Sequence, residues 1–176
     1  MEKIIDTVTI EGVDFTIIEK PKTLYAGFHS VALGFDNEPD FSDTYNRFQK
    51  EHTKIIDSIT PECRINLSIG YTEWHRKHDV IREAMDCKET TNINQPKDIK
   101  VIEAPSCLLI RVKVTDESWT LVEKNMGEKL MPHFFGLMGR LFFTPEQGFT
   151  NDGDLEMIYY HSDGTQYVAI PVRKNK

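Results

Sequence analysis

The sequence predicts an α+β fold, in which two copies of a strand–helix–strand–strand unit form one antiparallel sheet in a single domain of 176 residues. Three observations support this prediction. The chain closes on two short apolar runs joined by a tight turn, and a long apolar stripe with helical spacing lies in the first half. The pattern of the first half, 13–90, then begins again in the second half, 99–173.

Two predicted strands begin the first half. Val13–Lys20 and Leu24–Leu33 are rich in β-branched and aromatic residues, and Pro21 lies between them. Gly27 lies inside the second run, where a glycine indicates either a bulge or the close approach of another backbone.

A helix is predicted from about Phe41 to Ile59, because apolar residues recur there at spacings of three and four. Asp40 is placed to cap the N-terminus of this helix, and Pro61 follows its end. His52 falls within the apolar stripe, where a histidine is more often a packed core residue than a ligand.

The remaining elements follow the same reasoning. Arg64–Trp74 alternates as a strand does, Val80–Cys87 is a weaker strand candidate, and Lys88–Asp98 has the polar composition of a linker. In the second half Ile99–Val114 reads as a strand, and a helix with an interrupted apolar stripe begins near Asp116. We interpret the stripe as core packing.

The last predicted element is a hairpin over Gly153–Val172. Asp163 and Gly164 at its turn favour a type I′ geometry, which needs positive φ at both central residues. Because strand side chains alternate between faces, Glu156 shares a face with Tyr160. An acid beside aromatic residues on a sheet is either a solvated surface group or the anionic floor of a pocket.

An internal repeat relates the two halves. Ile17–Leu24 aligns with Val101–Leu108 at a constant offset, and the two segments share Ile, Glu, Pro and Leu. The same offset aligns Thr72 with Glu156. We therefore expect a duplication whose halves are related by a pseudo-twofold axis.

Such an axis would form a central cleft between the halves, with Glu156 at its floor and Trp74, Tyr71 and Tyr160 on its walls. A buried carboxylate without a partner resists ionisation, so its pKa rises. A cationic guest would offset that cost, and each cation–π contact adds about 0.5–2 kcal/mol. The sequence thus favours a flat, amphipathic, aromatic and cationic small molecule as ligand.

Composition and motifs exclude several other classes. A formal net charge of −7 argues against a surface for nucleic acid or anionic membrane. Cys63, Cys87 and Cys107 form no paired spacing, and free thiols indicate a reducing cytoplasm. The apolar run Phe134–Phe143 is too short to span a bilayer. Acidic residues occur where a signal peptide needs an apolar core.

No nucleotide-binding loop, nucleophile elbow or zinc-protease motif is present. His75 and His78 are three residues apart but have no evident third ligand, so a solvated loop is expected in place of a metal site. We expect no cofactor.

At this point the chain resembles the GyrI-like small-molecule-binding family, which also supplies the effector-binding domain of AraC-type and MerR-type multidrug regulators. The resemblance covers Val13 to Arg173 and is carried by FTIIEKPKTLYAGFHSVA, INLSIGY, KVIEAPSCLLIRV and DLEMIYYHSDGTQYVAIPV. Its most specific parts are the strand acid before the last hairpin and the closing Ile170-Pro171-Val172.

The resemblance implies a duplicated β-α-β-β unit with a central cleft, and it implies that Glu156 is the pocket acid. One departure is Ile158, at a position where the family commonly has tyrosine. No helix-turn-helix segment precedes the predicted domain, so a stand-alone member that does not itself bind DNA is expected.

Two functions remain open. The first is a binding module that senses or sequesters drugs or toxins, or acts through a protein partner, since the family includes stand-alone inhibitors of DNA gyrase. The second is a hydrolase that opens strained, cyclopropane-bearing electrophilic natural products, with Glu156 as general base. The natural ligand, the oligomeric state and the existence of a protein partner are left open by the sequence.

Overall fold

The computed structural model describes residues 2–33, 39–59, 62–70, 80–153 and 155–176 of the chain. Its elements, in chain order, are β1 (Lys3–Ile10), β2 (Val13–Lys20), β3 (Thr23–Leu33), α1 (Phe41–Glu51), a 3-10 turn η1 (His52–Lys54), β4 (Cys63–Gly70), β5 (Val80–Thr90), β6 (Lys100–Ala104), β7 (Cys107–Lys113), α3 (Asp116–Met126), α4 (His133–Phe142), β8 (Phe149–Asn151), β9 (Leu155–His161) and β10 (Gln166–Lys174).

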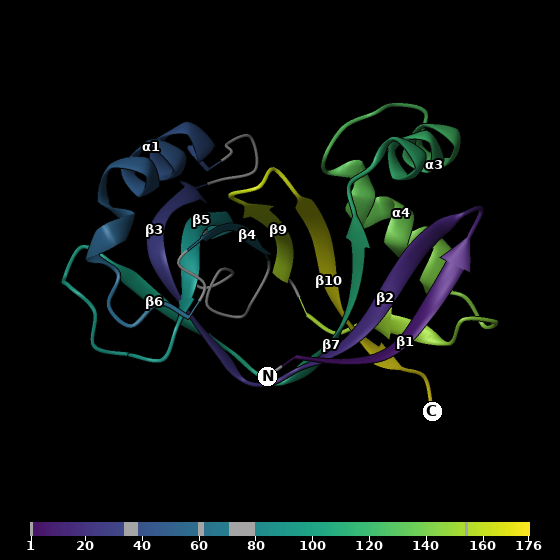
Figure 1. Cartoon of the computed structure of the whole chain (residues 1–176), viewed down its shortest axis with the longest axis horizontal. Helices are drawn as coiled ribbons and strands as arrows, with labels where there is room; N and C mark the ends of the chain where they lie inside the picture. Colours follow the sequence, from purple (N-terminus) through teal and green to yellow (C-terminus); the bar gives the residue numbers. More distant parts are fainter. Residues whose placement is uncertain (1, 34–38, 60–61, 71–79, 154) are drawn as a thin grey trace.

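These strands form one ten-stranded sheet in which every pairing is antiparallel, so the predicted α+β class is confirmed. The order across the sheet is β1-β2-β7-β10-β9-β4-β5-β3-β6, and β8 pairs with the end of β10 (Figure 1). The pairing of β9 with β4 joins the two halves of the chain at the middle of the sheet.

The described helices α1, α3 and α4 lie over one face of the sheet, which we call the helical face. α1 packs on β3 and β5, where Phe28 and Phe48 are buried together. α3 and α4 pack at the other side of the sheet, on a larger apolar cluster that includes Phe15, Ile110 and Val168. Figure 1 shows α1 at one side and α3 with α4 at the other, with β4, β9 and β10 between them. Of the described helices, α4 contacts the middle strand β10.

The opposite face of the sheet holds its own apolar core because the sheet curls on itself. The Tyr25 hydroxyl of β3 lies 3.7 Å from the Met157 sulfur of β9, although β4 and β5 separate these two strands. Both side chains are 1% exposed. Curvature of this kind follows from the right-handed twist of antiparallel sheets.

The two halves share one strand order. In the first half β3, β5 and β4 lie side by side, and in the second half β7, β10 and β9 do, with β4 and β9 innermost. The helical connections differ, because α1 alone covers the first half while α3 and α4 together cover the second. Common ancestry of the halves remains a prediction.

The N-terminal strand β1 was not predicted from the sequence. It pairs with β2 through Glu11 and Gly12, whose φ angles of 50° and 80° are both positive. This turn, and not the closing hairpin, has the positive φ pair that a type I′ turn requires. In the closing hairpin only Gly164 has positive φ, at 88°, so the predicted type I′ turn at Asp163 and Gly164 is wrong.

The first helix is shorter than predicted, although the Asp40 side chain caps it by accepting from the Asp43 backbone N–H at 2.9 Å. α1 ends at Glu51 and the chain becomes extended after η1. Gln95 explains the difference, because its side chain accepts from the Ile56 N–H at 2.9 Å and donates to the Ile56 carbonyl at 3.0 Å. These bonds replace the helical ones that the apolar spacing predicted.

Two further boundaries also differ from the predictions. β5 continues to Thr90, into the segment predicted as a linker. The predicted strand Ile99–Val114 is divided into β6 and β7 at Pro105, whose nitrogen cannot donate to a ladder. No helix among the described residues is long and apolar enough to cross a membrane.

The close backbone approach predicted at Gly27 is present and yields a testable expectation. A Cβ on Gly27 would lie 2.1 Å from the Asp86 carbonyl oxygen and 2.6 Å from the Cys87 Cα. Since neither backbone atom can move without opening the β3–β5 ladder, Gly27→Ala should lower the unfolding free energy by about 3 kcal/mol or more. Urea denaturation measures this change.

Gly139→Ala in α4 is the matched control. A Cβ on Gly139 would meet only the Phe143 ring at 3.5 Å, an ordinary contact, and the alanine would gain helix propensity. The control should therefore be neutral, or stabilising by up to about 1 kcal/mol. Equal destabilisation by both variants would contradict this account of the β3–β5 ladder.

Candidate functional site

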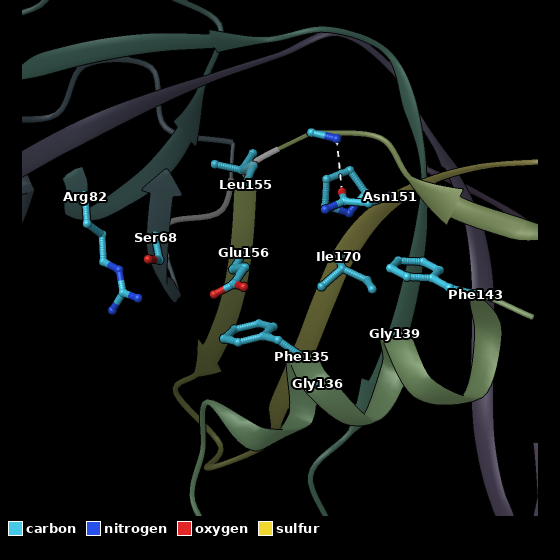
Figure 2. A pocket seen from close by; sticks show the side chains of 12 residues that line it. Ser68, Arg82, Phe135, Gly136, Gly139, Phe143, Asn151, Leu155, Glu156 and Ile170 are labelled. Carbon is cyan, nitrogen blue, oxygen red and sulfur yellow. Dashed lines mark hydrogen bonds between the residues drawn. The ribbon is translucent and has the colours of Figure 1, made fainter. Parts of the chain in front are cut away.

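The candidate site is a cavity of about 420 Å³ between α4 and the middle strands, on the helical face of the sheet. β4, β5, β9 and β10 contribute its floor and sides, and α4 covers it from the second half (Figure 2). The segment between β8 and β9 closes one end, where the Gly153 N–H donates to the Asn151 side-chain oxygen at 3.1 Å. The cavity lining therefore comes from both halves of the chain.

Glu156 lines this cavity from β9, and of the two readings of its strand face the structure has the carboxylate at a cavity and not at an open surface. The β4–β9 register pairs it with Ser68, so Ser68 holds the neighbouring floor position that the repeat offset had suggested for Thr72. Thr72 lies outside the described residues. The short Ser68 side chain leaves the carboxylate uncovered on that side (Figure 2).

Among the described residues, no hydrogen bond or ion pair reaches the Glu156 carboxylate. Its side chain is half-buried, and burial raises the pKa of Glu156 above its ordinary value of 4.5. The positive charge of Arg82 acts in the opposite direction without offsetting the burial. The guanidinium of Arg82 lies on the far side of Ser68 from Glu156 (Figure 2).

Aromatic rings and glycines of α4 form the wall that faces Glu156. Phe135 and Phe143 lie two turns apart on this wall, and Gly136 and Gly139 lie between them (Figure 2). Because glycine has no side chain, the helix leaves open volume at Gly139, whereas the Met126 methyl group occupies the corresponding space at Gly136. The remaining face of α4 packs in the core through four fully buried residues, Phe134, Leu137, Met138 and Phe142.

The structure places only part of the predicted site. Tyr160 lies on the same strand face as Glu156 but lines a different, neighbouring cavity, where the Arg64 guanidinium stacks 4.0 Å from its ring. Tyr71 and Trp74 lie outside the described residues. The α4 wall was missed because the run Phe134–Phe143 was read as core packing. The sequence feature that could have indicated this wall is the pair of glycines that interrupts an otherwise apolar helix.

A larger cavity of about 860 Å³ lies on the opposite face of the sheet. Its central cation, Lys20, is paired with Glu2 at 2.8 Å and with Glu89 at 2.6 Å. These contacts satisfy the buried charge within the chain. The cavity at Glu156 is smaller, but it contains a carboxylate that lacks such a partner, and we therefore consider it the candidate site.

Glu156→Gln should stabilise the protein near neutral pH. An acid whose pKa is raised by folding binds its proton more tightly in the folded state, so its ionisation costs stability as the pH rises through the folded pKa. Glutamine removes this cost. The advantage of Glu156→Gln in urea denaturation should be present at pH 7 and disappear below about pH 4.5, where glutamate is protonated in both states.

The matched control is Glu146→Gln, which neutralises an exposed carboxylate. It should leave the unfolding free energy nearly unchanged at both pH values, because exposed charges are screened. A wild-type protein more stable than Glu156→Gln at pH 7 would show that the carboxylate has a stabilising partner.

Comparison with known proteins establishes the fold. No family model matches the chain, and no curated protein does. Among solved structures, SAV2435 bound to tetraphenylphosphonium is 12% identical, with a TM-score of 0.62, and the match covers 90% of this chain and 93% of that one.

The regulator EcmrR, in its complex with DNA, is 13% identical with a TM-score of 0.55, and the match covers 94% of this chain and 59% of that one. The EcmrR C-terminal domain alone is 13% identical with a TM-score of 0.51, and the match covers 92% of this chain and 98% of that one. The fold is therefore the one seen in SAV2435 and in the C-terminal domain of EcmrR, consistent with the GyrI-like small-molecule-binding domain that the sequence resembles.

Proposed function

We propose that this chain binds an amphipathic aromatic cation in the cavity at Glu156. The observation that carries the proposal is the carboxylate itself, which is half-buried and has neither a hydrogen bond nor an ion pair among the described residues. A buried charge without a partner costs free energy, and a bound cation is the ligand that removes this cost.

The walls of the cavity support an aromatic ligand. Phe135 presents its ring beside the acid and Phe143 lies farther along the cavity, beyond Ile170 (Figure 2), and a cation over a ring gains about 0.5–2 kcal/mol. The volume of about 420 Å³ falls within the range of small-molecule sites. Tyr71 and Trp74 are proposed as further aromatic contacts, whereas Tyr160 lines the neighbouring cavity.

The neighbours of similar fold also support the proposal. SAV2435 is known with tetraphenylphosphonium, a lipophilic aromatic cation, bound to it. EcmrR acts on DNA, and its C-terminal domain has the present fold. We propose that this chain senses or sequesters such compounds, and that a sensing role would require a protein partner.

Tetraphenylphosphonium and a cationic aromatic dye should each bind one site per chain, and each should displace the other. Glu156→Gln should lower the affinity for the cationic dye by about 10–100-fold, because the carboxylate is the charge partner of the dye. A neutral dye with the same ring system should lose much less. Fluorescence anisotropy titrations at fixed pH and low salt measure both affinities.

Two variants make this test specific. Gly139→Leu should block both dyes, since its side chain would enter the cavity beside Phe143. Glu146→Gln should block neither. The proposal fails if Glu156→Gln weakens the cationic and neutral dyes equally, or if Gly139→Leu binds both as the wild type does.

Hydrolysis is the second candidate function, and the raised pKa of Glu156 favours it. A carboxylate whose pKa is shifted upward by burial is a stronger base once ionised, and general-base assistance is typically worth about 10²–10⁴ in rate. Such a group could deprotonate a water molecule that attacks a strained electrophilic ring held against Phe135.

Turnover separates the two functions. On incubation with cyclopropane-bearing aromatic electrophiles, an enzyme would add water to the ring, as detected by mass spectrometry. Glu156→Gln should then lose product formation by about 10²-fold or more while it keeps most of its affinity for the neutral substrate. If no compound of this class yields a protein-dependent product, the binding function alone remains.

A further inference from the structure

A second cavity, of about 310 Å³, lies under the end of α1 on the same helical face as Glu156. We call it the Lys88 pocket. It is lined by Phe48, His52, Glu62, Arg64, Lys88 and Tyr160, among others. Although the chain is acidic overall, most of the charged groups of this pocket are basic.

Lys88 is the notable group because it is 5% exposed and lacks a partner. Among the described residues, no carboxylate or carbonyl reaches its ammonium group, and its one printed contact is the Phe48 ring, with its centroid 6.0 Å from Nζ. Burial lowers the pKa of Lys88, and the carboxylate of the exposed Glu62 opposes this from a distance. Lysine is almost never buried to this degree without a counter-charge.

The neighbouring acid, Asp86, is not available to pair with Lys88, because Arg64 already binds it. The Arg64 guanidinium pairs with the Asp86 carboxylate at 2.6 Å. The carboxylate also accepts from the Thr44 hydroxyl at 2.7 Å and the Asn66 amide at 3.3 Å. Asp86 is therefore satisfied by other groups, and among the described residues Lys88 has no direct ion pair, only the more distant charge of Glu62.

His52 adds a second unsatisfied polar group to the pocket. Its Nδ1 is buried without a hydrogen-bond partner, and its ring stacks on Phe48 with centroids 5.2 Å apart. Burial, and then the charge of Lys88, lower the pKa of His52. A buried ring nitrogen and the end of a largely buried lysine side chain, whose ammonium nitrogen is not itself among the buried unpartnered atoms, thus line one cavity that also has aromatic surface.

We propose that the Lys88 pocket binds a small aromatic carboxylate. The carboxylate would pair with the ammonium group of Lys88, and the ring would lie against Phe48 or Tyr160. An oxyanion is a suitable partner for an ammonium group that has no direct ion pair among the described residues, and charge-assisted hydrogen bonds are stronger than neutral ones. The inference is independent of the proposed cation site, because it rests on other residues.

The sheet itself relates this pocket to the cavity at Glu156. The antiparallel β4–β9 register pairs Ser68 with Glu156 towards one end and Arg64 with Tyr160 towards the other. A local twofold axis through the middle of the strand pair exchanges these two couples, so Arg64 takes the place of Glu156. Equivalent positions thus carry opposite charges, as expected for two sites that select ligands of opposite charge.

Benzoate is the probe that tests the proposal, with benzamide as its neutral isostere and inorganic phosphate as an oxyanion without a ring. Calorimetric titration should find one benzoate per chain, weaker binding of phosphate, and no binding of benzamide. Benzoate should also raise the thermal midpoint in proportion to its saturation. Lys88→Met should lower the affinity for benzoate by about 30-fold or more, because it removes the charge partner of the carboxylate.

Lys50→Met and Glu156→Gln are the controls. Lys50 is an exposed cation on α1, so its loss changes the net charge equally and should leave benzoate affinity unchanged. Glu156→Gln should also retain benzoate. Without benzoate, Lys88→Met should unfold at the same or a higher temperature than wild type, since it removes a charge that has no direct ion pair among the described residues. Lys88→Gln serves as a second variant if Lys88→Met does not fold.

Three results would overturn the proposal. If benzoate does not bind the wild-type protein, the proposal is wrong. If Lys88→Met and Lys50→Met lower the benzoate affinity equally, the binding reflects general electrostatic attraction and not a site at Lys88. Phosphate that binds as tightly as benzoate would show an oxyanion site with no selection for the aromatic ring.

Discussion

The antiparallel pairing of β4 with β9 is the interaction on which the rest of the molecule depends. It joins the two halves of the sheet, and its register decides which side chains face the helices. Glu156 faces the helical side while its neighbour Met157 is buried in the core on the other side. Because side chains alternate with a period of two, a slip of one residue would put the carboxylate into that core.

The candidate sites differ from the structural parts of the sheet in whether their charged groups have hydrogen-bond partners. Glu83 is 3% exposed and, despite a burial that favours the neutral acid, hydrogen bonds from His29 and Lys100 hold the pKa of Glu83 to about 2. Glu156 and Lys88 receive no such bonds among the described residues, and burial shifts the pKa of each towards its neutral form. Groups kept in this condition are typical of binding sites.

Local sequence patterns were sufficient to predict much of the sheet. Val13–Lys20 matches β2 because its β-branched and aromatic residues are the ones that the sheet buries. β1 was missed because most of its residues are exposed and its charged residues hide the apolar alternation. The end of α1 could not be predicted, since the bonds that replace the helix come from Gln95, distant in sequence. Such tertiary contacts override helical propensity.

The candidate site was predictable only where one strand determines it. Alternation along β9 put Glu156 on a cavity floor, but the wall opposite depends on how α4 packs onto the sheet. Gly136 cannot become alanine without meeting the Met126 methyl group at 2.7 Å, so close packing of α3 on α4 accounts for this glycine. Gly139 has no such neighbour, and in a helix it costs about 0.5–1 kcal/mol relative to alanine. Packing therefore does not require a glycine at position 139, and the missing side chain leaves room in the cavity wall beside Phe143.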